Sequence, residues 1–171
     1  MSAKSKLSIF LDKPDWEIHD LTKLERLVGY NSETAKTFSG WTYWAQIGDV
    51  FETGDFDNLF LALDSAVEKF SPVKYLFKKI DIIEKSISAI YYPADMAILS
   101  RIREFMQNKG IVFVDENRDP FFSINVEVEE DIIEKSDLKL FIPSQTEIIF
   151  KTASILKLRR NKTRLYHRTK T

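Results

Sequence analysis

Short stretches in which apolar and polar residues alternate recur along the chain, and this period of two is typical of β-strands with one buried face. The pattern predicts strands at residues 6–11, 40–47, 87–92, 111–114 and 122–128. In the second strand, Trp44 shares a face with Thr42 and Gln46, so one large aromatic ring falls on an otherwise polar face. The strand at 122–128 is expected to be half-buried, with an acidic outer face.

Other stretches carry apolar residues three and four positions apart, which is the spacing of amphipathic helices. This spacing predicts helices at residues 14–28, 56–70, 72–83 and 94–109. Gly54 and Asp55 lead into the second of these helices, which is strongly amphipathic. Ser71 and Pro72 are typical of the cap and first position of the third helix, and Gly110 is expected to end the fourth.

One six-residue segment occurs twice, because residues 81–86 and 131–136 both read DIIEKS. The register continues without a gap, so that Pro93 corresponds to Pro143 and Ile98 to Ile148. Chance similarity is the alternative, but six consecutive identities with matched periodicity favour a duplication. The second copy is then predicted to contain a strand at 138–142, a helix at 145–158 and a strand near 163–167, stacked on the first copy in one sheet.

Together these elements predict an α+β fold, in which a β-sheet built from strand–helix–strand units carries helices on one face. A ferredoxin-like arrangement is one way to build it. The length of 171 residues suits a single domain. Residues 1–120 are expected to form its core, and residues 121–171 to add the repeated unit, with a basic C-terminus, to the same sheet.

The order of elements resembles that of a bacterial family of small α+β proteins described only as a domain of unknown function. The resemblance covers about residues 6–115 and rests on residues 7–11, Leu27-Val28-Gly29, Ser39-Gly40-Trp41, the helix from Phe56, and Ile90-Tyr91-Tyr92-Pro93. The family's Gly-x-x-Pro after the first helix is replaced here by Gly29-Tyr30-Asn31-Ser32, and residues beyond 120 look like an extension. The resemblance implies a fold and brings no activity with it.

The composition excludes several kinds of chemistry. There is no cysteine, which rules out disulfides, thiol nucleophiles and thiolate metal sites and fits a cytoplasmic location. The two histidines, His19 and His167, accompany no nucleophile motif, and five scattered glycines supply no phosphate-binding loop. Asp49, Glu52 and their acidic neighbours lack the calcium-loop pattern and are interpreted as a solvated loop and a helix cap. We therefore expect no catalytic residue, cofactor or metal, and no signal peptide or membrane span.

Two features of the sequence are candidates for binding a protein partner. Trp44 is the first, because an exposed tryptophan often anchors an interface, although a helix covering that face would bury it. The second is an acidic run that a basic partner would fit, formed by Glu127, Glu129, Glu130 and Asp131. The alternatives for this run are a solvated strand end and a paired-carboxylate site.

The C-terminal segment is strongly basic. Residues 157–171 hold seven of the 25 Lys and Arg residues and no acid, which leaves 18 basic and 26 acidic groups, a charge of −8, for residues 1–156. Phosphate contacts and base stacking make this segment a nucleic-acid candidate, through Lys157, Arg159, Arg160, Lys162, Arg164, Tyr166, His167, Arg168 and Lys170. A solubilising tail or a charged edge strand is the alternative.

These observations favour a non-catalytic intracellular module that binds a protein partner. An immunity or inhibitor protein of a bacterial or phage conflict system is one concrete version. The alternative is a nucleic-acid-binding accessory protein that uses the basic C-terminus, although the acidic body is unusual for that class. An enzyme built from dispersed Asp, Glu, Lys and Tyr residues is a third hypothesis, which a deep pocket with perturbed carboxylates would favour.

Overall fold

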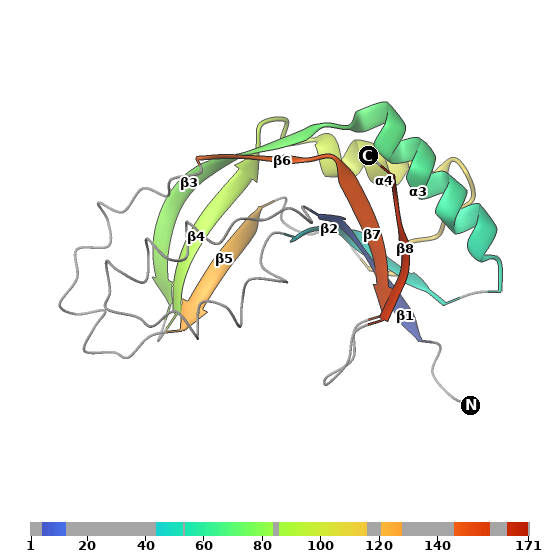
Figure 1. Ribbon diagram of the computed structural model, residues 1–171, viewed down its shortest axis with the longest axis horizontal. Coiled ribbons are helices and arrows are strands. Elements are labelled where there is room, and N and C mark those ends of the chain that lie inside the picture. Colours follow the sequence, from blue (N-terminus) through green and yellow to red (C-terminus); the bar gives the residue numbers. More distant parts are fainter. Residues whose placement is uncertain are drawn as a thin grey trace.

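A computed structural model describes residues 5–12, 44–52, 54–83, 86–115, 121–127, 146–157 and 164–170. These ranges contain eight strands and two helices (Figure 1). Their bounds in chain order are β1 (Lys6–Asp12), β2 (Trp44–Phe51), α3 (Phe56–Phe70), β3 (Val73–Ile83), β4 (Ser86–Pro93), α4 (Ile98–Gln107), β5 (Phe122–Glu127), β6 (Glu147–Phe150), β7 (Thr152–Lys157) and β8 (Arg164–Arg168). The fold class is therefore α+β, as the sequence predicts.

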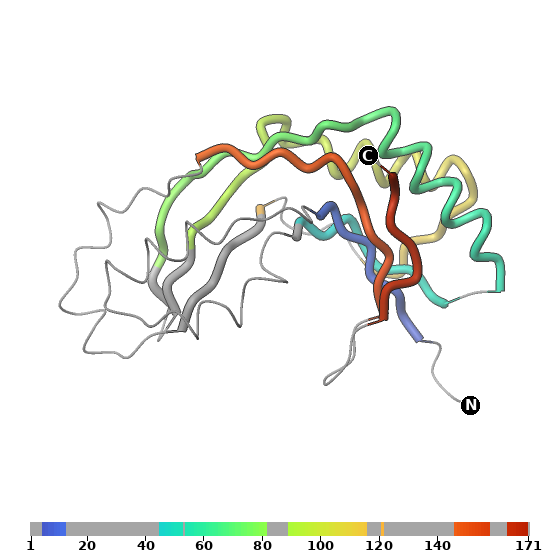
Figure 2. Tube along the Cα trace, in the orientation of Figure 1, coloured from blue at the N-terminus to red at the C-terminus, as the bar shows by residue number. Residues whose placement is uncertain are grey.

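The strands form two antiparallel sheets, whereas the sequence predicts one. Sheet A has the order β2-β1-β7-β8, and sheet B has the order β5-β4-β3-β6. The chain passes from sheet B to sheet A between β6 and β7, which only Lys151 separates (Figures 1 and 2). Strand β7 lies at the centre of sheet A, between β1 and β8. The last part of the chain therefore contributes strands to both sheets.

The hydrophobic core lies between the two helices and sheet A. Alternate residues of β1, Leu7, Ile9 and Leu11, are almost completely buried, as the period of two requires for a covered sheet face. The apolar stripes of α3 and α4 join the same core, through Leu63 and Met106 among others. Both helices lie on the same side of the sheet (Figure 1), so the predicted placement of helices on one face describes sheet A.

The start of α3 and the end of α4 follow the local sequence. The side chain of Asp55 accepts a hydrogen bond from the Asn58 backbone N–H at 3.2 Å, which caps α3. Gly110 has a φ of 92°, a conformation that favours glycine after a helix end. These two predictions are confirmed, although α4 begins at Ile98, four residues later than its pattern predicts.

The helix predicted at residues 72–83 is wrong, because this segment is strand β3. Val73, Tyr75 and Phe77 alternate toward the core, and a bulge between Phe77 and Lys79 then shifts the register. After the shift, Ile80 also faces the core, so inward residues fall at 73, 75, 77 and 80. Three of these positions, 73, 77 and 80, have helical spacing, and the bulged strand therefore resembles a helix in the sequence.

The helix predicted at residues 145–158 is also wrong, and the internal repeat is not confirmed. This segment forms β6 and β7, while the corresponding part of the first copy forms helix α4. Ile148 and Phe150 are buried in β6, and Ala153 and Ile155 in β7. The break at Lys151 leaves residues 148 and 155 seven positions apart, which is again helical spacing.

Several other predictions have mixed outcomes. Strands β1, β2, β4, β5 and β8 confirm the predicted ones at 6–11, 40–47, 87–92, 122–128 and near 163–167 within the described ranges. The strand predicted at 111–114 reduces to one bridge between Phe113 and Val50. The predicted helix at 14–28, the predicted strand at 138–142 and the second DIIEKS segment lie outside the described residues.

Candidate functional site

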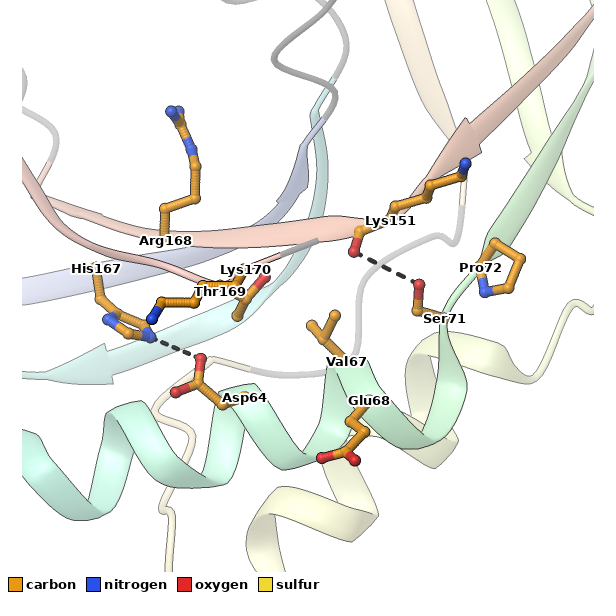
Figure 3. A pocket seen from close by; sticks show the side chains of 10 residues that line it. All are labelled: Asp64, Val67, Glu68, Ser71, Pro72, Lys151, His167, Arg168, Thr169 and Lys170. Atoms are coloured by element: carbon orange, nitrogen blue, oxygen red, sulfur yellow. Dashed lines mark hydrogen bonds and ion pairs between the residues drawn. The ribbon is translucent and has the colours of Figure 1, made fainter.

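An open groove of about 640 Å³ lies between α3 and the end of β8 (Figure 3). Its volume falls in the range of about 300–1,000 Å³ that is usual for ligand sites. The helix contributes residues at helical spacing, so a single face of α3 forms one wall. The residues that line the groove are Asp64, Val67, Glu68, Ser71, Pro72, Lys151, His167, Arg168, Thr169 and Lys170.

A β-bulge in β8 turns two consecutive aromatic side chains toward α3. Ile155 pairs with His167 and Leu156 with Leu165, so Tyr166 is the extra residue. The Tyr166 ring stacks on Phe56 with centroids 5.5 Å apart. The His167 ring stacks on Phe60 at 4.5 Å and is nearly parallel to it, with 6° between the planes. These contacts hold β8 firmly against the helix.

Polar contacts mark the two ends of the groove. At one end, His167 Nε2 lies 2.8 Å from Asp64 Oδ1 (Figure 3). At the other end, the Ser71 hydroxyl donates to the Lys151 carbonyl at 3.5 Å. From residue 64 to residue 71 a helix advances about 10 Å, at about 1.5 Å per residue. The groove is therefore long enough for about three residues of extended chain.

Glu52 anchors β8 beyond the groove. Lys157 Nζ lies 2.9 Å from Glu52 Oε2, and the Tyr166 hydroxyl donates to Oε1 at 2.8 Å. The hydrogen bonds from Lys157 and Tyr166 lower the pKa of the Glu52 carboxyl below its usual value, and the positive charges of Lys157 and Arg164 add to the effect. Two of the predicted nucleic-acid residues are thus engaged by an acid of the same chain.

Arg168 reaches the opposite face of sheet A. Its Nε lies 3.2 Å from Asp12 Oδ2 and 3.1 Å from the Ser154 hydroxyl oxygen. The Asp12 carboxylate, which is almost completely buried, also accepts from the hydroxyls of Thr152 and Ser154. A buried carboxylate requires such donors. Figure 3 shows the Arg168 side chain pointing away from the groove, so its backbone is the part that lines the groove.

The backbone of β8 has an open edge at the groove. In the described part of the chain, β8 pairs with β7 alone. The Thr169 N–H donates to the Ala153 carbonyl of β7 at 2.9 Å. Neighbouring residues of an antiparallel strand direct their N–H and C=O groups to opposite sides. The backbone groups of Arg168 and Lys170 therefore point away from β7, toward the open side.

The hydroxyls near His167 are already used in the fold. Ser71 donates to Lys151, and the Thr169 hydroxyl oxygen accepts from the Ala153 N–H at 2.9 Å. Neither hydroxyl forms a hydrogen bond with His167, whose ring contacts Asp64 instead. Across the described ranges, no group of three or more His, Asp and Glu residues could hold a metal ion. The groove presents backbone groups, charged side chains and an apolar helix face, and all of these can contact a bound molecule.

A second polar cluster occupies the corner between α4 and β2. Arg103 Nη1 donates to the Ile47 carbonyl at 3.0 Å and lies 3.3 Å from Asp115 Oδ1, while Nη2 donates to the Asp115 carbonyl at 2.9 Å. The guanidinium also covers the Phe113 ring, with its central carbon 4.3 Å from the ring centroid. A Cβ added to Gly48 would lie 2.4 Å from Nη1. The side chains of Arg103 and Asp115 are almost completely buried, so this cluster is largely closed to solvent.

An apolar groove of about 380 Å³ lies between β2, the start of α3 and residues 110–114. Val112 on its rim is 75% exposed, and Phe51 is also exposed. Exposed apolar residues of this kind often belong to interfaces. The sequence does not single out this groove, because Phe51 and Val112 come together only in the folded chain.

The predicted nucleic-acid-binding residues make several different contacts in the structure. Lys157, Tyr166, His167 and Arg168 are engaged as described above. Arg164 is exposed, with its guanidinium carbon 4.9 Å from the centroid of the Tyr166 ring. Lys170 is exposed and lines the groove. The three remaining candidates, Arg159, Arg160 and Lys162, lie outside the described residues.

The predicted protein-binding residues fall mostly beyond what the structure describes. Trp44 begins β2 and Glu127 ends β5, but their side chains belong to the undescribed part. Glu129, Glu130 and Asp131 lie wholly outside the described residues. The solvated-loop interpretation is wrong for Asp49, which is buried in β2 and accepts from Ser8 at 2.6 Å and Gln46 at 2.7 Å.

The partners of the basic strand were missed by sequence reasoning. Glu52 was interpreted as part of a solvated loop, while Asp12 and Asp64 were not singled out as polar partners. Asp64 and His167 lie 103 positions apart in the sequence, and Asp12 and Arg168 lie 156 apart. Local spacing carries no signal for such pairs. The bulge that turns Tyr166 and His167 to one side is likewise set by strand pairing.

Comparisons with known proteins add no family and no function to these observations. In the described residues, no helix is long and apolar enough to cross a membrane. The resemblance to a family of unknown function stays a prediction. No protein-family model matches the sequence, and no curated protein matches it either.

Proposed function

We propose that this chain is a non-catalytic binding module whose partner is another protein, and that the partner docks in the groove between α3 and β8. The observation that carries the proposal is the open backbone edge of β8, which borders a groove of about 640 Å³. Protein partners commonly use such edges, because an exposed strand offers ready hydrogen-bonding groups.

The rigid setting of this groove supports binding. Stacking on Phe56 and Phe60 fixes the two aromatic residues of β8, and Asp64 holds His167. A site that is already ordered loses little conformational entropy when a partner binds. The hydroxyls at the groove are engaged in the fold, which favours binding over catalysis.

A nucleic-acid partner is the second candidate, and it draws on the exposed Arg164 of β8 and on Lys170, which follows β8. Its support is weaker, because Lys157, His167 and Arg168 already contact acids of the same chain. Those acids would have to be neutralised before the three basic side chains could contact phosphates.

For the protein-binding module we propose a cytoplasmic location. The most concrete form of this proposal is an immunity or inhibitor protein.

A capture experiment with two matched variants tests the proposal. The tagged full chain is mixed with extract of its native cells, with and without nuclease, and bound proteins are identified by mass spectrometry. Glu68→Trp places a bulky ring at the groove from an exposed helical position. Glu104→Trp makes the same change at an exposed position of α4 that does not line the groove. We expect a protein captured by the wild type and by Glu104→Trp, and lost with Glu68→Trp.

Other outcomes contradict the proposal in different ways. Capture that depends on nucleic acid and disappears with nuclease would favour the second candidate. Capture retained by Glu68→Trp but lost on Val112→Trp would move the docking site to the apolar groove near β2. Circular dichroism spectra of all variants check that each retains the fold.

A further inference from the structure

We propose that the partner presents an extended, acidic segment, which adds to sheet A as a strand beside β8. This inference rests on the proposed function and names the chemistry of the partner at the same groove. Three observations carry it: the direction of the free backbone groups, the length of the groove, and the charges that remain unpaired along it.

The backbone of β8 sets the binding mode. The N–H and C=O groups of Arg168 and Lys170 point away from β7, because Thr169 between them bonds to Ala153 of β7. The Arg168 side chain turns to Asp12 on the other face of the sheet, which leaves its backbone accessible at the groove (Figure 3). An extended segment hydrogen-bonds to such an edge as a neighbouring strand would.

The dimensions of the groove suit a short segment. The wall formed by α3 between Asp64 and Ser71 corresponds to about 10 Å of helix, or about three residues of extended chain at about 3.3 Å each. Side chains of a strand point alternately to its two faces, so one or two of them face the helix. Val67 provides an apolar contact on that wall.

The unpaired charges select an acidic segment. Of the basic residues that line the groove, Arg168 contacts Asp12 and His167 contacts Asp64. Lys151 and Lys170 are exposed, and no acid among the described residues pairs with either. Of the two acids that line the groove, Asp64 contacts His167, and Glu68 is exposed. The remaining balance is positive, and complementary charges steer a partner and fix its register.

Synthetic peptides test the inference with the full chain. Three ten-residue peptides share alternating valines, and the other positions are Glu, Lys or Ser. Binding is followed by ¹⁵N–¹H NMR titration and by hydrogen exchange of the backbone amides. We expect the acidic peptide to bind most tightly and to protect the Arg168 and Lys170 amides from exchange. Tighter binding of the Lys peptide, or no binding of any peptide, would overturn the inference.

N-methylated peptides separate strand addition from charge attraction. In a strand, alternate N–H groups face the neighbouring strand. Methylation of the set that faces β8 is expected to lower affinity by more than about tenfold. It removes hydrogen bonds to β8, and the added methyl groups block close approach of the two strands. Methylation of the other set is expected to leave affinity nearly unchanged. Equal effects of the two sets would contradict a strand beside β8.

Variants of the protein test the charge argument. Lys170→Glu replaces an attraction by a repulsion and is expected to weaken the acidic peptide about fivefold, whereas Glu68→Lys is expected to strengthen it by a similar factor. Glu104→Lys, on α4 outside the groove, serves as the control for net charge. If all three variants changed affinity only with net charge, a specific acidic segment in this groove would be contradicted.

The peptide and capture experiments fail independently. A cellular protein whose capture depends on Glu68, combined with no protection of the Arg168 and Lys170 amides, would overturn strand addition and leave the proposed function standing. Strand addition of the acidic peptide, combined with cellular capture that ignores Glu68→Trp, would overturn the docking site in the proposed function and, with it, the assignment of the acidic segment to that partner.

Discussion

Arg103–Asp115 and His167–Asp64 each join a helix to another segment of the chain, and the two polar pairs differ in their exposure to solvent. In the corner between α4 and β2, the side chains of Arg103 and Asp115 are 9% and 10% exposed. In the groove between α3 and β8, those of His167 and Asp64 are 22% and 43% exposed. The first pair is enclosed by protein, and the second lies at the rim of an open groove.

This difference separates a structural role from a binding role. Removing one partner of a buried pair leaves an uncompensated charge, which costs about 3–5 kcal/mol of stability. An exposed pair contributes at most about 1 kcal/mol. The corner is therefore expected to contribute strongly to stability. The groove can exchange contacts with a partner without endangering the fold.

The largest effect is expected for Arg103→Ala. The change leaves the Asp115 carboxylate buried without its guanidinium and removes the donor to the Ile47 carbonyl. We expect a loss of about 3–5 kcal/mol in the free energy of unfolding, measured by urea denaturation. Arg101→Ala on the same helix breaks the exposed pair with Asp95, which precedes the helix, and it is the control. A loss below about 1 kcal/mol for Arg103→Ala would contradict the contrast between the two regions.

A smaller loss is expected for Gly48→Ala, which presses on the same corner. The added Cβ would lie 2.4 Å from Arg103 Nη1 and 2.6 Å from the Phe113 ring. Because the guanidinium is buried and hydrogen-bonded, it cannot move aside freely, and we expect a loss of about 1–3 kcal/mol. Gly54→Ala is the matched control, since nothing lies within 4 Å of its Cβ. Similar denaturation midpoints for the two variants would show that the corner is not tightly packed.

The sequence predicts elements well where the pattern is local and regular. Helix α3, with its cap at Asp55, and strands β1 and β4 follow directly from periodicity. For strand β3 and the pair β6–β7, the periodicity wrongly predicts helices. In both cases a bulge or break shifts the period of two, so that buried positions fall seven apart. Pairing with a distant strand decides the outcome, and local spacing cannot represent it.

The candidate site was predictable only in part. The basic strand β8 stands out in the sequence, and its residues do form one wall of the groove. The acids that engage it are 103 to 156 positions away along the chain, as for Asp64 and Asp12. The open edge of β8 depends on strand order, which the predicted repeat placed wrongly by assuming a helix before it. Charge composition identified the strand but not its contacts.

A modest loss of stability is expected for His167→Ala at the groove. The change removes the stacking on Phe60 and the contact with Asp64, and we expect a loss of about 1 kcal/mol in the free energy of unfolding. His167→Phe retains a stacking ring without the polar contact, so it separates the two contributions. If His167→Ala destabilised the chain as much as Arg103→Ala, the groove would belong to the structural class of the corner.

The smallest effect is expected from Glu52, and its signature is a dependence on pH. Hydrogen bonds from Lys157 and Tyr166 hold the pKa of Glu52 below its usual value in the folded chain. The folded state therefore favours the ionised carboxylate, and this stabilisation is fully present above the ordinary pKa of a glutamate. It is lost as the pH falls through the lowered pKa, where the folded chain also takes up the proton. The difference in denaturation midpoint between the wild type and Glu52→Gln should then shrink on acidification and stay constant toward neutral pH. A difference that does not change with pH would mean that the charge of Glu52 does not contribute to its anchoring of β8.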